Sequence, residues 1–186
     1  MEPTHSLETA DDHTLIEASL NGQPGAFDVI VRRHQRQVYQ LCYRFVGNHE
    51  EASDLAQDAF IRAYRGLGGF KGNAALTTWL YRIAVNLCLN RVKRRTLEPV
   101  ALESRDHEDH RIERADARLL RQERAAEVRA AIARLAPKQR AALILRAYHD
   151  LPHEQIAAIL GSSVGAVKAN FFHALGNLKK LLQTES

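Results

Sequence analysis

The chain has 186 residues, enough for one ordinary domain or two small ones and too few for most multidomain enzymes. Hydrophobic residues make up 45% and charged residues 26%, a composition that favours folding over disorder. No apolar run approaches the roughly 18 residues of a membrane helix, and the acidic N-terminus lacks the pattern of a signal peptide. Two cysteines are too few for a disulfide framework. We therefore expect a soluble cytoplasmic protein.

Charge is distributed unevenly along the chain. Acidic side chains predominate in residues 1–58, with ten acidic and four basic, and in residues 96–116, with seven acidic and three basic. Residues 59–95 carry eight basic side chains and no acidic ones, and residues 117–186 carry eleven basic and five acidic. A long segment with only positive charge repels itself unless an anionic partner offsets it, and nucleic acid is the commonest such partner. A basic surface that is merely solvated has the same composition, so charge alone leaves both interpretations open.

Hydrophobic periodicity near 3.6 residues, with almost no strand signal, predicts an all-α fold. In the first half, the expected helices cover residues 11–20, 26–46, 50–65 and 77–93. Asp11 and Asp12 can cap the first of these helices, and Gly47 can end the second. Four glycines between residues 66 and 72 indicate a loop before the helix expected over 77–93.

The second half is expected to form a separate unit. Residues 96–116 lack an apolar stripe, and helical periodicity returns at Arg118 and continues to Leu182. The sequence therefore predicts two small helical domains joined by a flexible charged linker. The expected boundaries are a tail over 1–10, a first domain over 11–95, a linker over 96–117 and a second domain over 118–183.

The second domain carries a helix-turn-helix pattern. A helix beginning at Pro152 ends at Gly161, which permits a tight turn, and Ser162 or Ser163 can cap the next helix. Six residues are expected on the face opposite the apolar stripe of that helix, or beside that face, namely Ala166, Lys168, Ala169, Asn170, Phe172 and His173. Small and polar groups around one exposed aromatic suit the major groove of DNA, although similar patterns occur in plain helical bundles.

The first domain offers two candidate surfaces. Glu51, Asp54 and Asp58 fall on one helical face, which is either solvated or docks on a basic partner. The segment from Phe70 to Arg95 interleaves aromatics with cations and has no carboxylate, as single-stranded DNA binding requires. Each stacked base contributes roughly 1–3 kcal/mol. The alternative is that the aromatics, Trp79 above all, belong to the core.

Two long segments resemble a known family. Residues 54–90, DLAQDAFIRAYRGLGGFKGNAALTTWLYRIAVNLCLN, look like region 2 of bacterial extracytoplasmic-function (ECF) sigma factors, and residues 135–175 look like their region 4. Both segments, their order and the linker match. The resemblance implies a group 4, sigma-70 family promoter-specificity subunit of bacterial RNA polymerase. Such an alternative sigma factor directs core polymerase to the promoters of a stress or envelope-response regulon.

The resemblance also implies roles for individual residues. Those expected to contact the clamp helices of the large polymerase subunit are Glu51, Asp54, Gln57 and Asp58. Those expected to bind the −10 element as single-stranded DNA are Phe70, Lys71, Asn73, Arg82, Asn86, Arg91 and Arg94. Those expected to read the −35 element as duplex are Ser163, Lys168, Ala169, Asn170, Phe172 and His173. The loop over 68–76, together with Asn86, is expected to capture a flipped base.

The recognition helix departs from the family pattern. Many members carry serine or threonine at the position of Ala169, and arginine at the positions of Asn170 and Leu175, so this helix is poorer in cations. Relatives are commonly held inactive by an anti-sigma factor, often membrane-anchored. The resemblance therefore implies three partners, namely core RNA polymerase, promoter DNA and an anti-sigma factor.

The sequence gives no sign of catalysis. It has no P-loop, no G-x-S-x-G motif and no paired carboxylates in an apolar context, so we expect no enzyme, cofactor or small-molecule substrate. His107 and His110 lack a cysteine partner, which disfavours a metal site, and Cys42 and Cys88 are expected to be buried. Two alternatives remain. A stand-alone helix-turn-helix regulator needs neither the acidic face nor the glycine-rich loop, and an interaction protein uses its basic patches only to bind partners.

Overall fold

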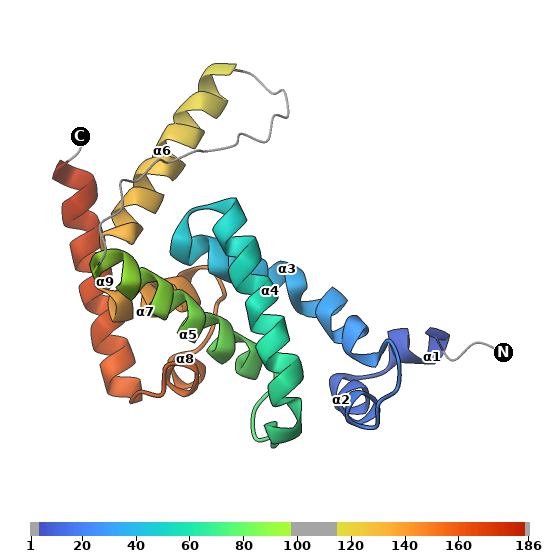
Figure 1. The fold of residues 1–186 in the computed structure, drawn as a ribbon. Coiled ribbons are helices and arrows are strands. Elements are labelled where there is room, and N and C mark those ends of the chain that lie inside the picture. The colour runs from blue at the N-terminus through green and yellow to red at the C-terminus, as the bar shows by residue number, and fades with distance from the viewer. Residues whose placement is uncertain (1–3, 98–114, 185–186) are drawn as a thin grey trace.

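The computed structural model describes residues 4–97 and 115–184, and these segments are helical with no strand (Figure 1). The prediction of an all-α fold is confirmed. Before the gap lie α1 (Thr4–Thr9), α2 (Asp12–Leu20), α3 (Ala26–Val46), α4 (His49–Gly66), a short 3-10 turn (Leu67–Gly69) and α5 (Leu76–Leu97). After it lie α6 (Ala115–Ala133), α7 (Pro137–Ala147), α8 (His153–Leu160) and α9 (Val164–Thr184). We call α1–α5 the first module and α6–α9 the second module.

Local sequence signals account for the helix boundaries. Asp11 accepts a hydrogen bond from the backbone N–H of Thr14 at 2.8 Å, and Asn48 accepts one from that of Glu51 at 2.9 Å. Gly47 ends α3 in the left-handed conformation, with φ of 70°. Helix α5 extends four residues past its predicted end because its last turn is basic, which favours a helix C-terminus.

The N-terminus differs from the prediction. A tail is predicted over residues 1–10, whereas residues 4–9 form α1. Its Leu7 is buried in the core, and its Glu8 pairs with Arg32 of α3. Because α1 has only six residues, its hydrophobic periodicity is too short to recognise in the sequence, and tertiary contacts stabilise the helix. Most of the predicted linker over 96–117 lies outside the described residues.

The first module is a bundle in which α3, α4 and α5 pack together, with α2 across α3. Its largest fully buried side chains include Ile30, Leu41 and Leu80. Cys42 and Cys88 are both buried in this core as free thiols, as predicted. In the second module α9 packs along α7 and α8, and the shared core includes Ile144, Ile156 and Val167 among other side chains.

The two modules contact each other directly. Helix α5 packs against α7 and α8, and α3 packs against α7 (Figure 1). Contacts that cross between the modules involve Arg44, Phe45, Tyr81, Arg140, Tyr148 and His149, and we call these residues the module interface. The sequence predicted two domains and a linker but gave no indication of this contact.

Arg140 is the most buried charged side chain of the module interface. It is 6% exposed, and its Nη1 donates a hydrogen bond to the carbonyl oxygen of Phe45 at 3.2 Å. Its Nη2 donates to the carbonyl oxygen of Ala133. An arginine of the second module thus binds a carbonyl of the last turn of α3, where the helix dipole is negative. Burial lowers the pKa of Arg140 to about 10, so it stays charged at neutral pH.

Candidate polymerase and nucleic-acid interfaces

Helix α4 exposes the polar face that the sequence predicts. Asp54, Gln57 and Asp58 are exposed, and neither carboxylate forms an ion pair with the residues that the structure describes. The opposite face of α4 is anchored in the core through Leu55 and Ala59. We call Asp54, Gln57 and Asp58 the α4 ridge. It is an acidic surface available to a basic partner.

Glu51 does not share this environment. Its side chain is only 13% exposed, and its Oε1 lies 3.1 Å from Nε of Arg91, while Oε2 pairs with Arg95. Arg95 also donates a hydrogen bond to the carbonyl oxygen of Val46 at 3.3 Å. The carboxylate therefore ties the start of α4 to the end of α5, an arrangement that sequence spacing along α4 alone does not reveal.

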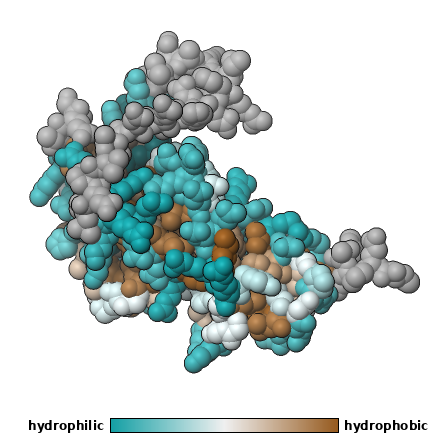
Figure 2. Space-filling view, viewed as in Figure 1, coloured by the Kyte–Doolittle hydropathy of each residue, from teal (hydrophilic) through white to brown (hydrophobic). Residues whose placement is uncertain are grey.

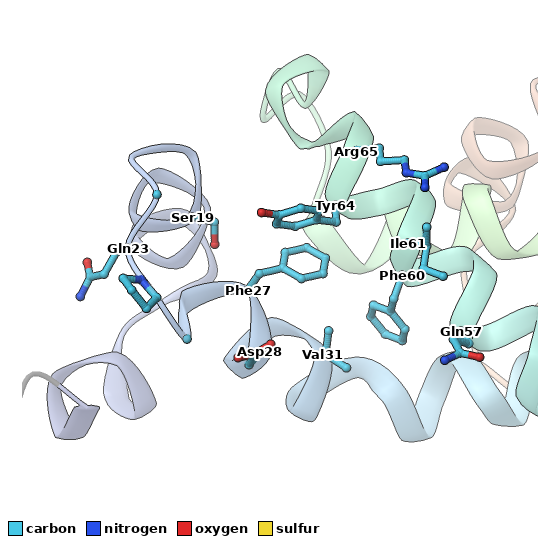
Figure 3. A pocket seen from close by; sticks show the side chains of 13 residues that line it. Ser19, Gln23, Phe27, Asp28, Val31, Gln57, Phe60, Ile61, Tyr64 and Arg65 are labelled. Atoms are coloured by element: carbon cyan, nitrogen blue, oxygen red, sulfur yellow. The ribbon is translucent and has the colours of Figure 1, made fainter.

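An apolar groove adjoins the α4 ridge, and the sequence analysis did not anticipate it. It has a volume of about 730 Å³ between the turn before α3, α3 itself and α4 (Figure 3). Phe27 and Tyr64 face each other in it with ring centroids 5.0 Å apart. Ile61 and Tyr64 are 42% and 61% exposed, and hydrophobic surface is visible around α2 and α3 in Figure 2. Ile61 and Tyr64 lie on α4 outside its buried stripe, and hydrophobic residues at such positions are the sequence signal that could have revealed the groove.

The predicted −10 residues lie in the loop before α5 and along α5. Lys71 and Asn73 are exposed in the loop, where Gly72 adopts φ of 69°. Phe70 is half-buried, with its ring centroid 5.2 Å from that of Trp79. Trp79 packs against the core, in agreement with the core interpretation. The aromatic pair therefore supports the loop, and Phe70 presents only part of its ring to solvent.

Helix α5 carries the remaining predicted −10 residues. Arg82 and Asn86 are exposed one turn apart on the same face. Arg94 is exposed near the end of the helix, whereas Arg91 is held by Glu51. Six of the side chains predicted to bind DNA, in the loop and on α5, are thus exposed, namely Lys71, Asn73, Arg82, Asn86, Arg91 and Arg94.

The second module contains the helix-turn-helix, formed by α8, the turn at Gly161 and α9. Gly161 has φ of 58°, and Ser163 Oγ accepts a hydrogen bond from the N–H of Ala166 at 3.1 Å. The ring of His153 in α8 meets that of Phe171 in α9 edge to face, with centroids 5.9 Å apart. These local contacts hold α9 at a fixed angle to α8. Ser163 caps α9, which occupies its hydroxyl oxygen.

The exposed face of α9 matches most of the predicted −35 residues. Lys168, Ala169 and His173 are exposed, and Phe172 is 74% exposed. Asn170 is half-buried, and its Nδ2 donates a hydrogen bond to the carbonyl oxygen of Ala166 at 2.9 Å. This bond to its own helix ties up one donor of the amide. Leu175, which is not among the predicted site residues, is 46% exposed.

Comparison with known proteins identifies the family of this helical fold. The family described as Sigma-70 region 2 matches residues 30–98, and Sigma-70, region 4 matches residues 125–178. The chain is 38% identical over 186 residues to the RNA polymerase sigma-H factor of Pseudomonas aeruginosa, covering 95% of this chain and 96% of that protein. It is 35% identical over 176 residues to the ECF RNA polymerase sigma-E factor of Escherichia coli K12, covering 90% and 92%.

Solved structures agree with this relationship. The structure of CnrH in complex with the cytosolic domain of CnrY superimposes with a TM-score of 0.69 at 27% identity, covering 94% of this chain and 99% of that one. RpoE of Bartonella quintana, solved with the anti-sigma factor NepR, shares the fold with a TM-score of 0.67 at 23% identity, covering 87% and 99%. The fold and its surfaces define a promoter-reading transcription factor. The chain belongs to the ECF group of the sigma-70 family.

The family resemblance is thereby confirmed, and so is the predicted function as an alternative sigma factor. The protein is an alternative sigma factor, a DNA-binding transcription initiation factor that directs RNA polymerase to promoters. None of the helices in the described segments has the length and apolar character needed to span a membrane. Within those segments no group of three or more His, Cys, Asp or Glu residues could hold a metal ion, and His107 and His110 lie outside them.

Proposed function

We propose that the two modules divide the work of this sigma factor. The predicted domain over 11–95, which lies in the first module, binds core polymerase and the −10 element. The predicted domain over 118–183, which lies in the second module, binds the −35 element, with 96–117 as the connection. The observation that supports this division is that polar side chains are exposed on α4 and α5 in the first module and on α9 in the second. The protein acts in the cytoplasm, where the polymerase works, without a catalytic step of its own.

Core polymerase docks on the α4 ridge. Asp54 and Asp58 lie one turn apart and free of intramolecular ion pairs in the described segments, so they are available to a basic surface such as the clamp helices of the large subunit. Gln57 lies on the ridge and also lines the adjoining groove. Glu51 contributes indirectly, since its ion pairs with Arg91 and Arg95 fix the angle between α4 and α5.

The −10 element binds as single-stranded DNA along α5 and the loop before it. Lys71, Arg82 and Arg94 neutralise phosphates, and Asn73 and Asn86 offer amides for hydrogen bonds to an unstacked base. Phe70 and Trp79 brace the loop against the core. Arg91 is oriented by its ion pair with Glu51 and keeps part of its side chain exposed for a phosphate contact.

The −35 element binds as duplex, with α9 in the major groove. The exposed residues Lys168, Ala169, Phe172 and His173 face the DNA, and α8 braces α9 from behind. Ser163 contributes by starting the helix, through its cap on Ala166. The N-terminal turn of α9 suits a phosphate contact, because the helix dipole is positive there.

A protein inhibitor is the third partner. The similar protein CnrH was solved with the cytosolic domain of CnrY, which supports an anti-sigma factor for this chain as well. The genes under control are those of a stress or envelope response, as the extracytoplasmic-function resemblance implies. A membrane-anchored inhibitor would connect such a signal to transcription.

Run-off transcription tests the proposal. Core polymerase is mixed with fragmented genomic DNA, with and without the protein, and the transcript starts are sequenced. New starts that share two spaced upstream elements are expected. DNA binding by the protein alone, with no new starts when core polymerase is present and competent with another sigma factor, would contradict it.

A further inference from the structure

Helix α9 exposes two large apolar side chains between two cations. Lys168, Phe172, Leu175 and Lys179 recur at i, i+4, i+7 and i+11, which places them along one side of the helix. Phe172 is 74% exposed and Leu175 46% exposed, and both lie outside the set of side chains that pack against the hydrophobic core. We call Phe172 and Leu175 the apolar pair of α9.

The core of the second module does not use the apolar pair. Val167 and Ala174 are buried on another side of α9, and Phe171 and Leu178 pack against the core beside them. Phe172 meets only the ring of His173 among the aromatic residues described, with centroids 5.9 Å apart. Two neighbouring apolar side chains left in water contribute little to folding, and a bound partner that covered them would gain free energy by removing their surface from water.

The surroundings of the pair indicate which partner. Lys168 and Lys179, one on each side of it, are suited to phosphates, whereas the pair itself cannot accept or donate a hydrogen bond. In the major groove the apolar group that a natural base pair presents is the 5-methyl group of thymine. Three residues along a helix rise about 4.5 Å, close to one base-pair step of about 3.4 Å.

We propose that Phe172 and Leu175 read thymine methyl groups at neighbouring base pairs of the −35 element. This inference rests on the proposed function, in which α9 enters the −35 duplex. It assigns a specificity role to Leu175, which is not among the residues predicted to read the −35 element. Reading by methyl contact replaces reading by hydrogen bonds at those base pairs, which fits a recognition helix with few cations.

Deoxyuridine substitution tests the inference. Holoenzyme formed with the full chain is titrated with a promoter obtained by run-off transcription, in which one thymidine of the −35 element at a time is replaced by deoxyuridine. This replacement removes the methyl group and keeps the base pair. At one or two thymines we expect affinity to fall about threefold to fivefold, the value of one buried methyl group. In Phe172→Ala and Leu175→Ala that sensitivity disappears at the thymine each residue contacts.

Lys168→Ala is the matched control, because it should weaken binding to every probe and leave the methyl sensitivity intact. Equal binding of thymidine and deoxyuridine probes, a −35 element without A·T pairs, or sensitivity that persists in both alanine variants would overturn the inference while leaving the sigma-factor function standing. Reduced core-polymerase binding by the two variants, with normal methyl sensitivity, would show that a protein covers the pair instead. Failure of the holoenzyme to recognise any promoter would overturn both proposals.

Discussion

The hydroxyl of Tyr81 lies 3.1 Å from Nδ1 of His149, and their rings meet edge to face with centroids 5.1 Å apart. Tyr81 is on α5 of the first module, and His149 is in the turn between α7 and α8 of the second. Nearby, the guanidinium carbon of Arg44 lies 4.1 Å from the ring centroid of Tyr148. These pairs give the module interface specific polar and aromatic contacts.

Loss of the Tyr81 hydroxyl should weaken the module interface. In Tyr81→Phe the ring contact remains, but a hydrogen bond worth about 0.5–1.5 kcal/mol is lost. Urea unfolding, with fluorophores reporting the distance between modules, should show earlier separation of the modules. Tyr64→Phe, which alters an exposed tyrosine of the groove, is the control and should unfold like the wild type. Identical curves for all three proteins would mean that the modules do not depend on this bond.

The module interface should loosen in acid. Burial, and secondarily the charge of Arg44, lower the pKa of His149, and its Nε2 is buried with no hydrogen-bond partner in the described segments. A depressed pKa means that the separated state binds the proton more tightly. Stability of the closed arrangement is therefore complete above the ordinary histidine pKa of about 6.5 and falls as pH drops through the lowered value.

This pH effect can be isolated with His149→Asn, which keeps a polar group at Nδ1 and cannot titrate. The distance between modules should change with acid in the wild type and much less in the variant, at constant ionic strength. An equal acid response in both proteins would exclude His149 as the group responsible for the effect.

Glu51→Gln should destabilise the first module rather than abolish polymerase binding. The variant loses two ion pairs that join α4 to α5, and because both arginines are about 45% exposed we expect about 1–2 kcal/mol. Thermal unfolding measures the loss. At a temperature where the variant remains folded, its affinity for core polymerase should stay within a few-fold of wild type. A large loss of affinity with normal stability would return Glu51 to the group of direct contacts.

Asp54→Ala combined with Asp58→Ala should weaken polymerase binding and leave the stability of the fold nearly unchanged. Both side chains are exposed, so the melting temperature should hardly change, while the loss of two charges from the docking surface should lower affinity at least about thirtyfold. A fluorescence titration with core polymerase gives the affinity. Ser53→Ala, an exposed neighbour on α4, should bind normally. Unchanged binding by the double variant would remove the α4 ridge from the polymerase interface.

Asn86→Ala should impair promoter opening without affecting assembly of the holoenzyme. Asn86 is exposed on α5 and makes no core contact, so its loss removes about one hydrogen bond to the −10 strand, a twofold to tenfold effect. Permanganate reactivity of unpaired thymines reports opening, and core binding serves as the internal control. Equal opening on −10 variants by both proteins would exclude a base contact.

The sequence predicted those features that depend on local chemistry. Helix α3 was expected over 26–46 and spans Ala26–Val46, because its apolar period, the turn before it and Gly47 act within a few residues. The cap of Asp11 and the turn at Gly161 follow in the same way. The exposed face of α9 was also predictable, since one buried stripe determines which side chains face away.

What the sequence could not predict depends on residues far apart in the chain. The bond between Arg140 and Phe45 spans 95 positions, and the contact between Tyr81 and His149 spans 68. The pairing of Glu51 with Arg91 and Arg95 likewise requires the packing of α4 against α5. The i, i+3, i+7 spacing that grouped Glu51 with Asp54 and Asp58 describes one helix only, and it does not reveal a neighbouring helix that supplies two arginines.

Helix α8 packs between α5 and α9 and thereby determines the distance between these two helices. Packed helices have axes about 8–10 Å apart, so the two helices proposed to read DNA are separated by roughly 20 Å across α8. Elements at −10 and −35 are about 25 base pairs apart, which corresponds to about 85 Å along B-DNA at 3.4 Å per pair. The separation of α5 and α9 is therefore about a quarter of the distance between the two promoter elements. For α5 and α9 to read both elements at the same time, as proposed, the two modules would have to separate, and the free energy of the module interface would oppose promoter binding.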